Sequence, residues 1–255
     1  MINPMQFGAS STPPLFNDVD AHRTHVKVHL AAGFRLFAKL GLNIGVAGHI
    51  TARDPALPDH FWVNPFGVAY EAMRPQDLSL VRHDGTLVEG EPVNAAAFAI
   101  HSEIHRARPD VVCAAHGHPV HGTAWAALAR PLDPIGQDVC AFFEDHVVFD
   151  EAMGLVLDLS EGARIASSLS DRKAAILRNH GLLTVGRTVD EALWWFVLMD
   201  RCCRMQLLAE AAGTPHHLPD EQARDIARQI GTPAFGWFQC QPLLKSILSG
   251  MKTET

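Results

Sequence analysis

The sequence predicts an α/β (α+β layered) fold in which helices cover a sheet built from hairpins. Two observations carry this prediction. Apolar residues recur every three to four positions in several long segments, and shorter apolar runs bounded by Gly, Pro or Asp lie between them. Hydrophobic residues form 47% of the 255 residues, which is ample for one core, and no repeat or linker divides the chain. A single layered domain is therefore expected.

The N-terminal third predicts one helix followed by short strands. Residues 20–40 have apolar residues at helical spacing, and Gly41 ends that pattern. Residues 45–53 are a predicted glycine-rich turn that enters a strand, and residues 61–67 are a predicted strand and turn. Residues 78–88 are a predicted hairpin with an Asp-Gly turn. Strand hairpins mixed with helices indicate a single layered α+β domain.

Helices and strands alternate in the rest of the chain. Helical spacing appears at residues 95–106, 123–128 and 161–169, and a strand is expected at residues 111–115. Two more strand-like runs flank a turn at His180. The last predicted helix, residues 189–212, starts at a Thr cap and ends at a Gly.

Charge and cysteine content limit the function classes. The net charge is −7, with no basic cluster, which argues against a nucleic-acid or anionic-membrane surface. The N-terminus lacks a signal-peptide pattern, and no apolar run is long enough to cross a membrane. Five cysteines without a Cys-x-x-Cys motif indicate reduced thiols. We expect a cytoplasmic protein.

The most informative motif is a pair of histidines, His116 and His118, directly after an apolar run. Residues i and i+2 of a strand point the same way, so both rings could bind one metal ion; on a helix they would diverge by roughly 200°. Because the chain has 15 histidines, about one such pair is expected by chance. With His180 they suggest a three-histidine metal site, and the alternative is a set of hydrogen-bonded core histidines.

Several short motifs occur together in an order that resembles the class II aldolase/adducin family. They are Gly48-His-Ile-Thr-Ala-Arg53, Val63-Asn-Pro-Phe-Gly67 with Tyr70-Glu71, Arg108-Pro-Asp110, His116-x-His118 and Arg178-Asn-His-Gly181. The resemblance runs from about His22 to Gly213. It implies a three-layer αβα sandwich around a mainly antiparallel sheet, usually a homotetramer with its sites at subunit interfaces.

The resemblance also implies domain boundaries and a metal. Residues 1–19 are expected to form a flexible N-terminal arm, residues 20–213 the family domain, and residues 214–255 a tail that packs on the domain or on a neighbouring subunit. In family enzymes three histidines bind a divalent ion, usually Zn²⁺, with Mn²⁺ or Fe²⁺ as alternatives. Those histidines match His116, His118 and His180 here, and the ion would polarise a substrate carbonyl.

This chain departs from the family pattern where sugar-phosphate aldolases bind phosphate and transfer protons. A Ser-Ser-Glu run in those enzymes falls on Ala95, Ala96 and Ala97 here. Their phosphate-binding asparagine falls on His49, and the threonine of a Thr-Gly turn falls on Phe66, beside the retained Gly67. A methyl group neither accepts a proton nor binds phosphate. The substrate is therefore expected to be a small molecule without phosphate.

Another residue must then replace the missing glutamate. His49 is our leading candidate for proton transfer and His121 the second. Phe66, Gly67, Ala97 and His101 are expected to line the substrate pocket. His101 lies four residues after Ala97 on the same predicted helix face, and its alternative role is a hydrogen-bonded core residue.

Three function classes remain open from the sequence. The preferred one is a divalent-metal-dependent carbon–carbon lyase, aldolase- or decarboxylase-like, that stabilises the enolate of a non-phosphorylated carbonyl or carboxylate compound. Decarboxylation needs no base to remove a hydroxyl proton, so it tolerates Ala97. The alternatives are a non-haem Fe(II) oxygenase acting on aryl-pyruvates and a non-catalytic, adducin-like interaction module.

Overall fold

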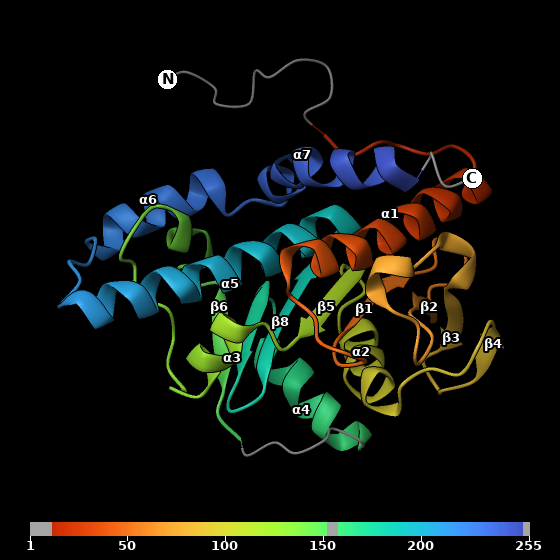
Figure 1. Ribbon diagram of the computed structural model, residues 1–255, viewed down its shortest axis with the longest axis horizontal. Helices are drawn as coiled ribbons and strands as arrows, with labels where there is room; N and C mark the ends of the chain where they lie inside the picture. The colour runs from red at the N-terminus through yellow and green to blue at the C-terminus, as the bar shows by residue number, and fades with distance from the viewer. Residues whose placement is uncertain (1–11, 152–157, 252–255) are drawn as a thin grey trace.

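Eight strands form one sheet within residues 12–151 and 158–251, which are the residues that the computed structural model describes (Figure 1). The sheet order is β4-β3-β2-β1-β5-β8-β7-β6, and every neighbouring pair is antiparallel except the parallel pair β6–β7. The strand bounds are β1 His49–Arg53, β2 His60–Val63, β3 Ser79–Arg82, β4 Leu87–Glu89, β5 Cys113–Gly117, β6 His146–Phe149, β7 Ala174–Leu177 and β8 Gly181–Gly186.

Helices cover both faces of this sheet, which confirms the predicted fold class. In Figure 1, α1 and α5 lie on one face, α2 and α4 lie on the other, and α7 packs over α1 and α5 from outside. The helix bounds are α1 Val19–Leu40, α2 Ala95–Ala107, α3 Val120–Ala126, α4 Leu159–Leu169, α5 Val189–Ala212, α6 Asp220–Ile230 and α7 Pro233–Met251, with short 3₁₀ turns η2 Tyr70–Ala72, η3 Pro75–Asp77 and η4 Asp138–Phe142.

The two sheet faces carry separate hydrophobic cores. Side chains alternate along β5, so that Cys113 and Ala115 join the core under α1 and α5, while Ala114 joins the core under α2 and α4. His116 lies two residues beyond Ala114 and therefore points to the α2 side. His49 is directly opposite His116 in the antiparallel pair of β1 and β5. The register thus places these two imidazoles next to each other on one face.

Helices α2, α4 and α5 lie within two residues of their predicted bounds, whereas α3 and β6 differ from the sequence predictions. Helix α5 covers the predicted residues, with the Thr188 side chain accepting a hydrogen bond from the Glu191 amide. Helix α3 begins at Val120, three residues before the predicted start. It contains Gly122. A Cβ added at this position would lie 2.4 Å from Cδ1 of Leu182, so close packing rather than helix propensity requires glycine there. Strand β6 was not predicted.

The structure describes part of the predicted N-terminal arm and most of the predicted C-terminal tail. The predicted N-terminal arm falls partly outside the described residues, which begin at residue 12. The predicted C-terminal tail contains α6 and α7, and α7 contacts both α1 and α5. None of the described helices is both long and apolar enough to cross a bilayer.

Candidate metal centre

Three histidines from two chain segments meet at the end of the central strand. His116 lies in β5 and His118 just beyond its end, while His180 lies in the turn between β7 and β8. Asn179 in that turn has a φ of 56°, a left-handed conformation that asparagine tolerates. The amide of His180 donates to the carbonyl of Leu177 at 2.9 Å, which closes the turn. Because β8 pairs with β5, the turn carries His180 to the end of β5.

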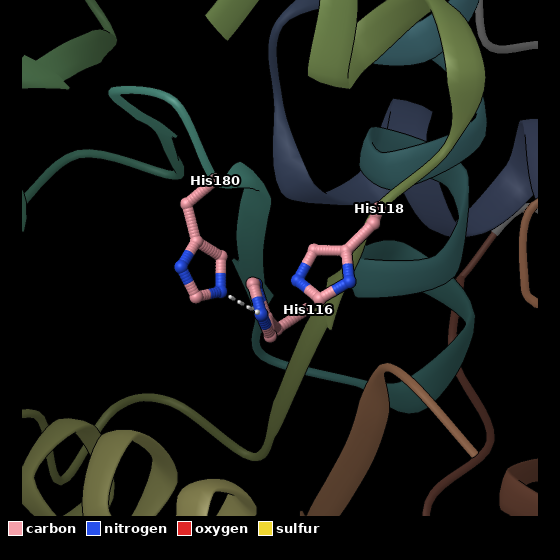
Figure 2. A group of neighbouring side chains, drawn as sticks. All are labelled: His116, His118 and His180. Atoms are coloured by element: carbon pink, nitrogen blue, oxygen red, sulfur yellow. Dashed lines mark hydrogen bonds between the residues drawn. The ribbon is translucent and has the colours of Figure 1, made fainter. Parts of the chain in front are cut away.

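One pair among the three clustered imidazoles has the nitrogen–nitrogen separation that a shared zinc ion requires. One ring nitrogen from each lies within 4.8 Å of the others, and the ring centroids are 4.7–5.0 Å apart. Figure 2 shows the rings of His116 and His180 facing each other, and their Nε2 atoms are 3.2 Å apart. Two nitrogens on a tetrahedral zinc ion at about 2.0–2.1 Å would be about 3.3 Å apart. The geometry fits such an ion.

Backbone contact fixes the tautomer of His116 in the form that binds metals. Its Nδ1 atom lies 2.9 Å from the carbonyl oxygen of Leu182. A carbonyl only accepts hydrogen bonds, so Nδ1 carries the proton and donates it. Nε2, which faces His180, then has a free lone pair. A fixed outer hydrogen bond of this kind orients the histidine ligands of metal sites.

Burial favours the neutral form of His116 and His118, which is the form that binds metals. Burial lowers the pKa of His116 well below its usual range, and the neighbouring imidazoles of His180, His49 and His118 lower it further. Burial also lowers the pKa of His118. The Nε2 atom of His118 is buried and has no hydrogen-bond partner among the described residues. Such orphaned atoms are rare in folded proteins, and a bound ion would supply the missing contact.

The cluster is closed on one side and open on the other. His116 is 2% exposed, whereas His118 and His180 are half-buried. Three protein ligands and an accessible side are typical of metal sites that bind a substrate, because structural sites usually have four protein ligands. The arrangement thus suits an ion that takes part in chemistry.

His49, the leading candidate for proton transfer, lies beside the three ligands. It is 4% exposed, and its ring centroid is 5.8 Å from that of His116. Neither of its ring nitrogens has a hydrogen-bond partner among the described residues. Burial lowers the pKa of His49 well below its usual range, with further contributions from His101, His118 and His180. At neutral pH the ring is therefore neutral, with one N–H and one lone pair.

The other predicted site residues have different surroundings. His101 is fully buried on α2, and its ring meets His49 edge to face at a centroid distance of 5.7 Å. Phe66 is 58% exposed, and the adjacent Gly67 has a φ of 86°. Ala97 belongs to α2, but its side chain lies outside the described residues.

His121 lies in a separate hydrogen-bond network. Its Nδ1 atom is 3.2 Å from a carboxylate oxygen of Asp200 on α5, and Asp200 also accepts the amide of Gly122 at 2.8 Å. Its ring makes no ring–ring contact with the three ligands in the described part of the chain. His121 remains a predicted site residue with an acidic partner.

Sequence reasoning overlooked two residues near the site, Thr51 and His105. The Thr51 hydroxyl lies 2.7 Å from Nδ1 of His101 and 2.9 Å from Nε2 of His105. The only sequence signal is that Thr51 is two residues after His49 on the same strand face, and that His105 is four residues after His101 on one helix face.

The fold and the site together define a class of protein, an α/β sandwich with three histidines that converge at the end of its central strand. Comparisons with known proteins identify the family. Residues 28–207 match the model of the Class II Aldolase and Adducin N-terminal domain. The chain is 49% identical to the Decarboxylase NovR of Streptomyces niveus over 93% of this chain and 89% of that protein.

Two further relatives cover nearly the whole chain. The 4-hydroxy-3-prenylphenylpyruvate oxygenase/4-hydroxy-3-prenylbenzoate synthase of Streptomyces roseochromogenus subsp. oscitans is 48% identical over 93% of this chain and 87% of that protein. The solved structure of L-fuculose 1-phosphate aldolase from Glaciozyma antarctica PI12 has a TM-score of 0.89 and 40% identity, covering 96% of both chains. This chain belongs to the class II aldolase/adducin family, as its motifs predicted.

Proposed function

We propose that this protein is a divalent-metal-dependent enzyme that breaks a carbon–carbon bond next to a carbonyl group in a non-phosphorylated substrate. One observation carries the proposal: the imidazoles of His116, His118 and His180 come together, and the His116 tautomer is fixed with the lone pair of its Nε2 atom facing His180. The similarity to a decarboxylase over 93% of the chain supports a lyase-type reaction. His116, His118 and His180 would hold the ion, with Zn²⁺ as the leading choice and Mn²⁺ or Fe²⁺ as alternatives.

The substrate class follows from the chemistry of bond cleavage. A bound divalent ion would act as a Lewis acid that polarises the carbonyl oxygen. The bond that breaks must leave its electron pair conjugated with that carbonyl, which selects a β-keto acid that loses CO₂ or a β-hydroxy carbonyl compound that releases an aldehyde. The carbon that keeps the electron pair must then receive a proton.

His49 is the proposed donor of that proton. It is neutral, buried and adjacent to His116, and its two nitrogens lack partners among the described residues. A neutral imidazole donates its N–H proton and recovers one on the other nitrogen, which is the behaviour required of a general acid. His121 is the second candidate, and its Nδ1 atom lies 3.2 Å from a carboxylate oxygen of Asp200.

We propose that the substrate carries no phosphate, because of the residues at the family's phosphate-binding positions. Ala95, Ala96 and Ala97 offer no hydroxyl or carboxyl group. Phe66 is an exposed aromatic side chain, and an apolar wall at this position suits an aromatic substrate. Since a 40%-identical solved relative is named for L-fuculose 1-phosphate, that sugar phosphate is the decisive competing substrate.

An oxygenase reaction is the second candidate, and one observation favours it. A relative that is 48% identical is named as an oxygenase of a prenylated phenylpyruvate. Three histidines with open coordination positions also suit Fe(II). In that case the substrate would be an aryl α-keto acid and O₂ would be consumed.

Metal analysis and a substrate panel test the proposal together. Protein purified without added metal would be assayed by mass spectrometry for bound metals, then loaded with Zn²⁺, Mn²⁺ or Fe²⁺. We expect CO₂ or aldehyde release from aryl β-keto or β-hydroxy carbonyl compounds with Zn²⁺ or Mn²⁺. O₂ uptake with 4-hydroxyphenylpyruvate and Fe²⁺ would establish the oxygenase instead. Efficient cleavage of L-fuculose 1-phosphate would refute the substrate class.

Assembly and location are proposed on separate observations. Apolar side chains near the site residues in sequence are exposed, including Ile44 (73%), Val46 (48%) and Val120 (75%), and a subunit interface would cover them. We therefore propose a homotetramer with the site at the interface, and light scattering would measure its mass. All five cysteines are unpaired and buried, which supports a reducing, cytoplasmic location.

A further inference from the structure

Three buried ring nitrogens beside the metal centre have no partner. They are Nδ1 and Nε2 of His49 and Nε2 of His101, and no described residue bonds to any of them. The two rings meet edge to face with centroids 5.7 Å apart. Buried polar atoms almost always have a partner, so this cluster is suited to a small polar group that comes from outside the chain.

The other nitrogen of His101 belongs to a hydrogen-bonded chain that leads away from the metal centre. The Thr51 hydroxyl lies 2.7 Å from Nδ1 of His101 and 2.9 Å from Nε2 of His105. His101, Thr51 and His105 are all at most 1% exposed. At the far end, Nη2 of Arg53 lies 3.5 Å from Nδ1 of His105. Water therefore does not interrupt this chain.

A single hydroxyl proton couples the two imidazoles. Thr51 donates its one proton to one ring and accepts a proton from the other. Burial lowers the pKa of His101 to about 3 and that of His105 well below its usual range, so both rings are neutral at pH 7. If His105 carries its proton on Nε2, Thr51 must donate to Nδ1 of His101, and His101 must carry its proton on Nε2. The two rings thus share one tautomer.

The groups around Nδ1 of His105 decide which tautomer this is. Arg53 only donates, which favours a bare Nδ1 on His105. The Val111 carbonyl is a competing partner for His105, because it would accept a proton from the ring. This hydrogen bond raises the pKa of His105, whereas burial and Arg53 lower it. That carbonyl oxygen has two lone pairs and also accepts Nε of Arg53 at 3.1 Å. The contact of Arg53 with Nδ1 favours the Nε2–H tautomer of both rings.

We propose that Thr51 is a positioning residue that, with His105, holds His101 in the Nε2–H tautomer. His101 then presents an N–H donor, beside His49, for an oxygen atom of the ligand. The inference rests on the proposed function insofar as that oxygen belongs to the carbonyl or carboxylate substrate. It assigns to Thr51 and His105 a role that follows from their contacts alone.

The tautomer can be measured without any turnover. Magic-angle-spinning NMR of the ¹⁵N-histidine-labelled full chain, metal-free and zinc-loaded, distinguishes a protonated from a bare ring nitrogen, and a His101→Gln variant assigns the signal. We expect protonated Nε2 in the parent and in Thr51→Ser, and a mixture of both tautomers in Thr51→Val. Protonated Nδ1 in the parent, or no change in Thr51→Val, would overturn the inference.

Ligand affinity provides the second readout. Titration calorimetry with phenylpyruvate on the zinc-loaded chain should show about tenfold weaker binding for Thr51→Val, about equal binding for Thr51→Ser, and unchanged zinc content. Thr184→Val is the matched control, because Thr184 is a buried strand threonine whose hydroxyl donates to the Ala192 carbonyl at 2.9 Å. Its affinity should equal that of the parent. Equal affinity in Thr51→Val would refute the donor role.

These outcomes separate the inference from the proposed function. If phenylpyruvate fails to bind the parent protein, the substrate class is wrong, while the NMR measurement still decides the tautomer. If Thr51→Val does not fold, His105→Phe removes only the hydrogen bond between Thr51 and His105. It keeps an aromatic ring in the stack with Phe61, whose centroid is 5.3 Å from that of the present His105 ring. His101 should show the same loss of a single tautomer in that variant.

Discussion

Individual residues near the proposed metal centre differ in the one or two groups that they contact. His116 and His49 face each other across β1 and β5, yet only His116 has an outer hydrogen bond, to the Leu182 carbonyl. That bond commits one nitrogen of His116 and leaves the other for a metal ion. His49 keeps both nitrogens available, which suits a group that moves a proton rather than one that binds an ion.

This difference predicts opposite phenotypes for two single substitutions. His116→Ala should lose bound metal and activity together, because a ligand is missing. His49→Phe keeps a planar ring and removes both nitrogens, so metal content should be unchanged while kcat falls roughly 10²–10⁴-fold, the usual contribution of a general acid. Metal analysis and steady-state kinetics on both variants give the comparison. Loss of metal in His49→Phe would instead identify His49 as a ligand.

At the scale of elements, the β7–β8 turn and the end of β5 position the ligands through close backbone packing. A Cβ added at Gly181 would lie 2.4 Å from the Gly117 carbonyl oxygen and 2.8 Å from Cδ2 of His118. Both distances are shorter than the closest approach of non-bonded atoms. The glycine after His180 therefore allows the two metal-ligand segments to touch.

Gly181→Ala should consequently disturb the site as well as the sheet. The free energy of unfolding should fall by about 1–3 kcal/mol, as for other overpacked positions, and zinc affinity should fall at least tenfold because His118 must move. Gly136→Ala is the control, since a Cβ at Gly136 meets no atom within 4 Å. Denaturant unfolding and zinc titration measure the two effects. Parent-like zinc affinity in Gly181→Ala would show that the packing does not position His118.

Across the whole molecule, sequence predicted the features that are encoded locally and missed those that depend on distant partners. Helix α5 was predicted because its apolar spacing and its Thr188 cap lie within one segment. The clustering of His116, His118 and His180 was predicted because their motifs are short and ordered, and their role as metal ligands stays a prediction. Strand β6 was missed because its four residues gain a partner only through the parallel pair with β7. The Thr51 contacts were missed because they join β1 to α2, about fifty residues apart in sequence.

The buried histidines as a group make the stability of the folded protein sensitive to acid. Burial lowers the pKa of His101 to about 3, with a smaller contribution from His105, whereas an unfolded histidine titrates near 6.5. Below pH 6.5 the unfolded chain therefore binds more protons than the folded one, and stability falls as the pH falls towards 3. His49, His105 and His116 shift in the same direction.

Between pH 7.5 and pH 5, His101 alone should contribute a loss of about 2 kcal/mol in the free energy of unfolding. Asp54, with its pKa lowered to about 2, loses its contribution only below this window, and the raised pKa of Glu191 acts in the opposite direction. Urea unfolding of the metal-free protein at both pH values and one protein concentration measures the loss. In His101→Gln, the loss of unfolding free energy between the two pH values should be smaller by about 2 kcal/mol. An unchanged loss would mean that His101 is already protonated in the folded protein or stays accessible to protons.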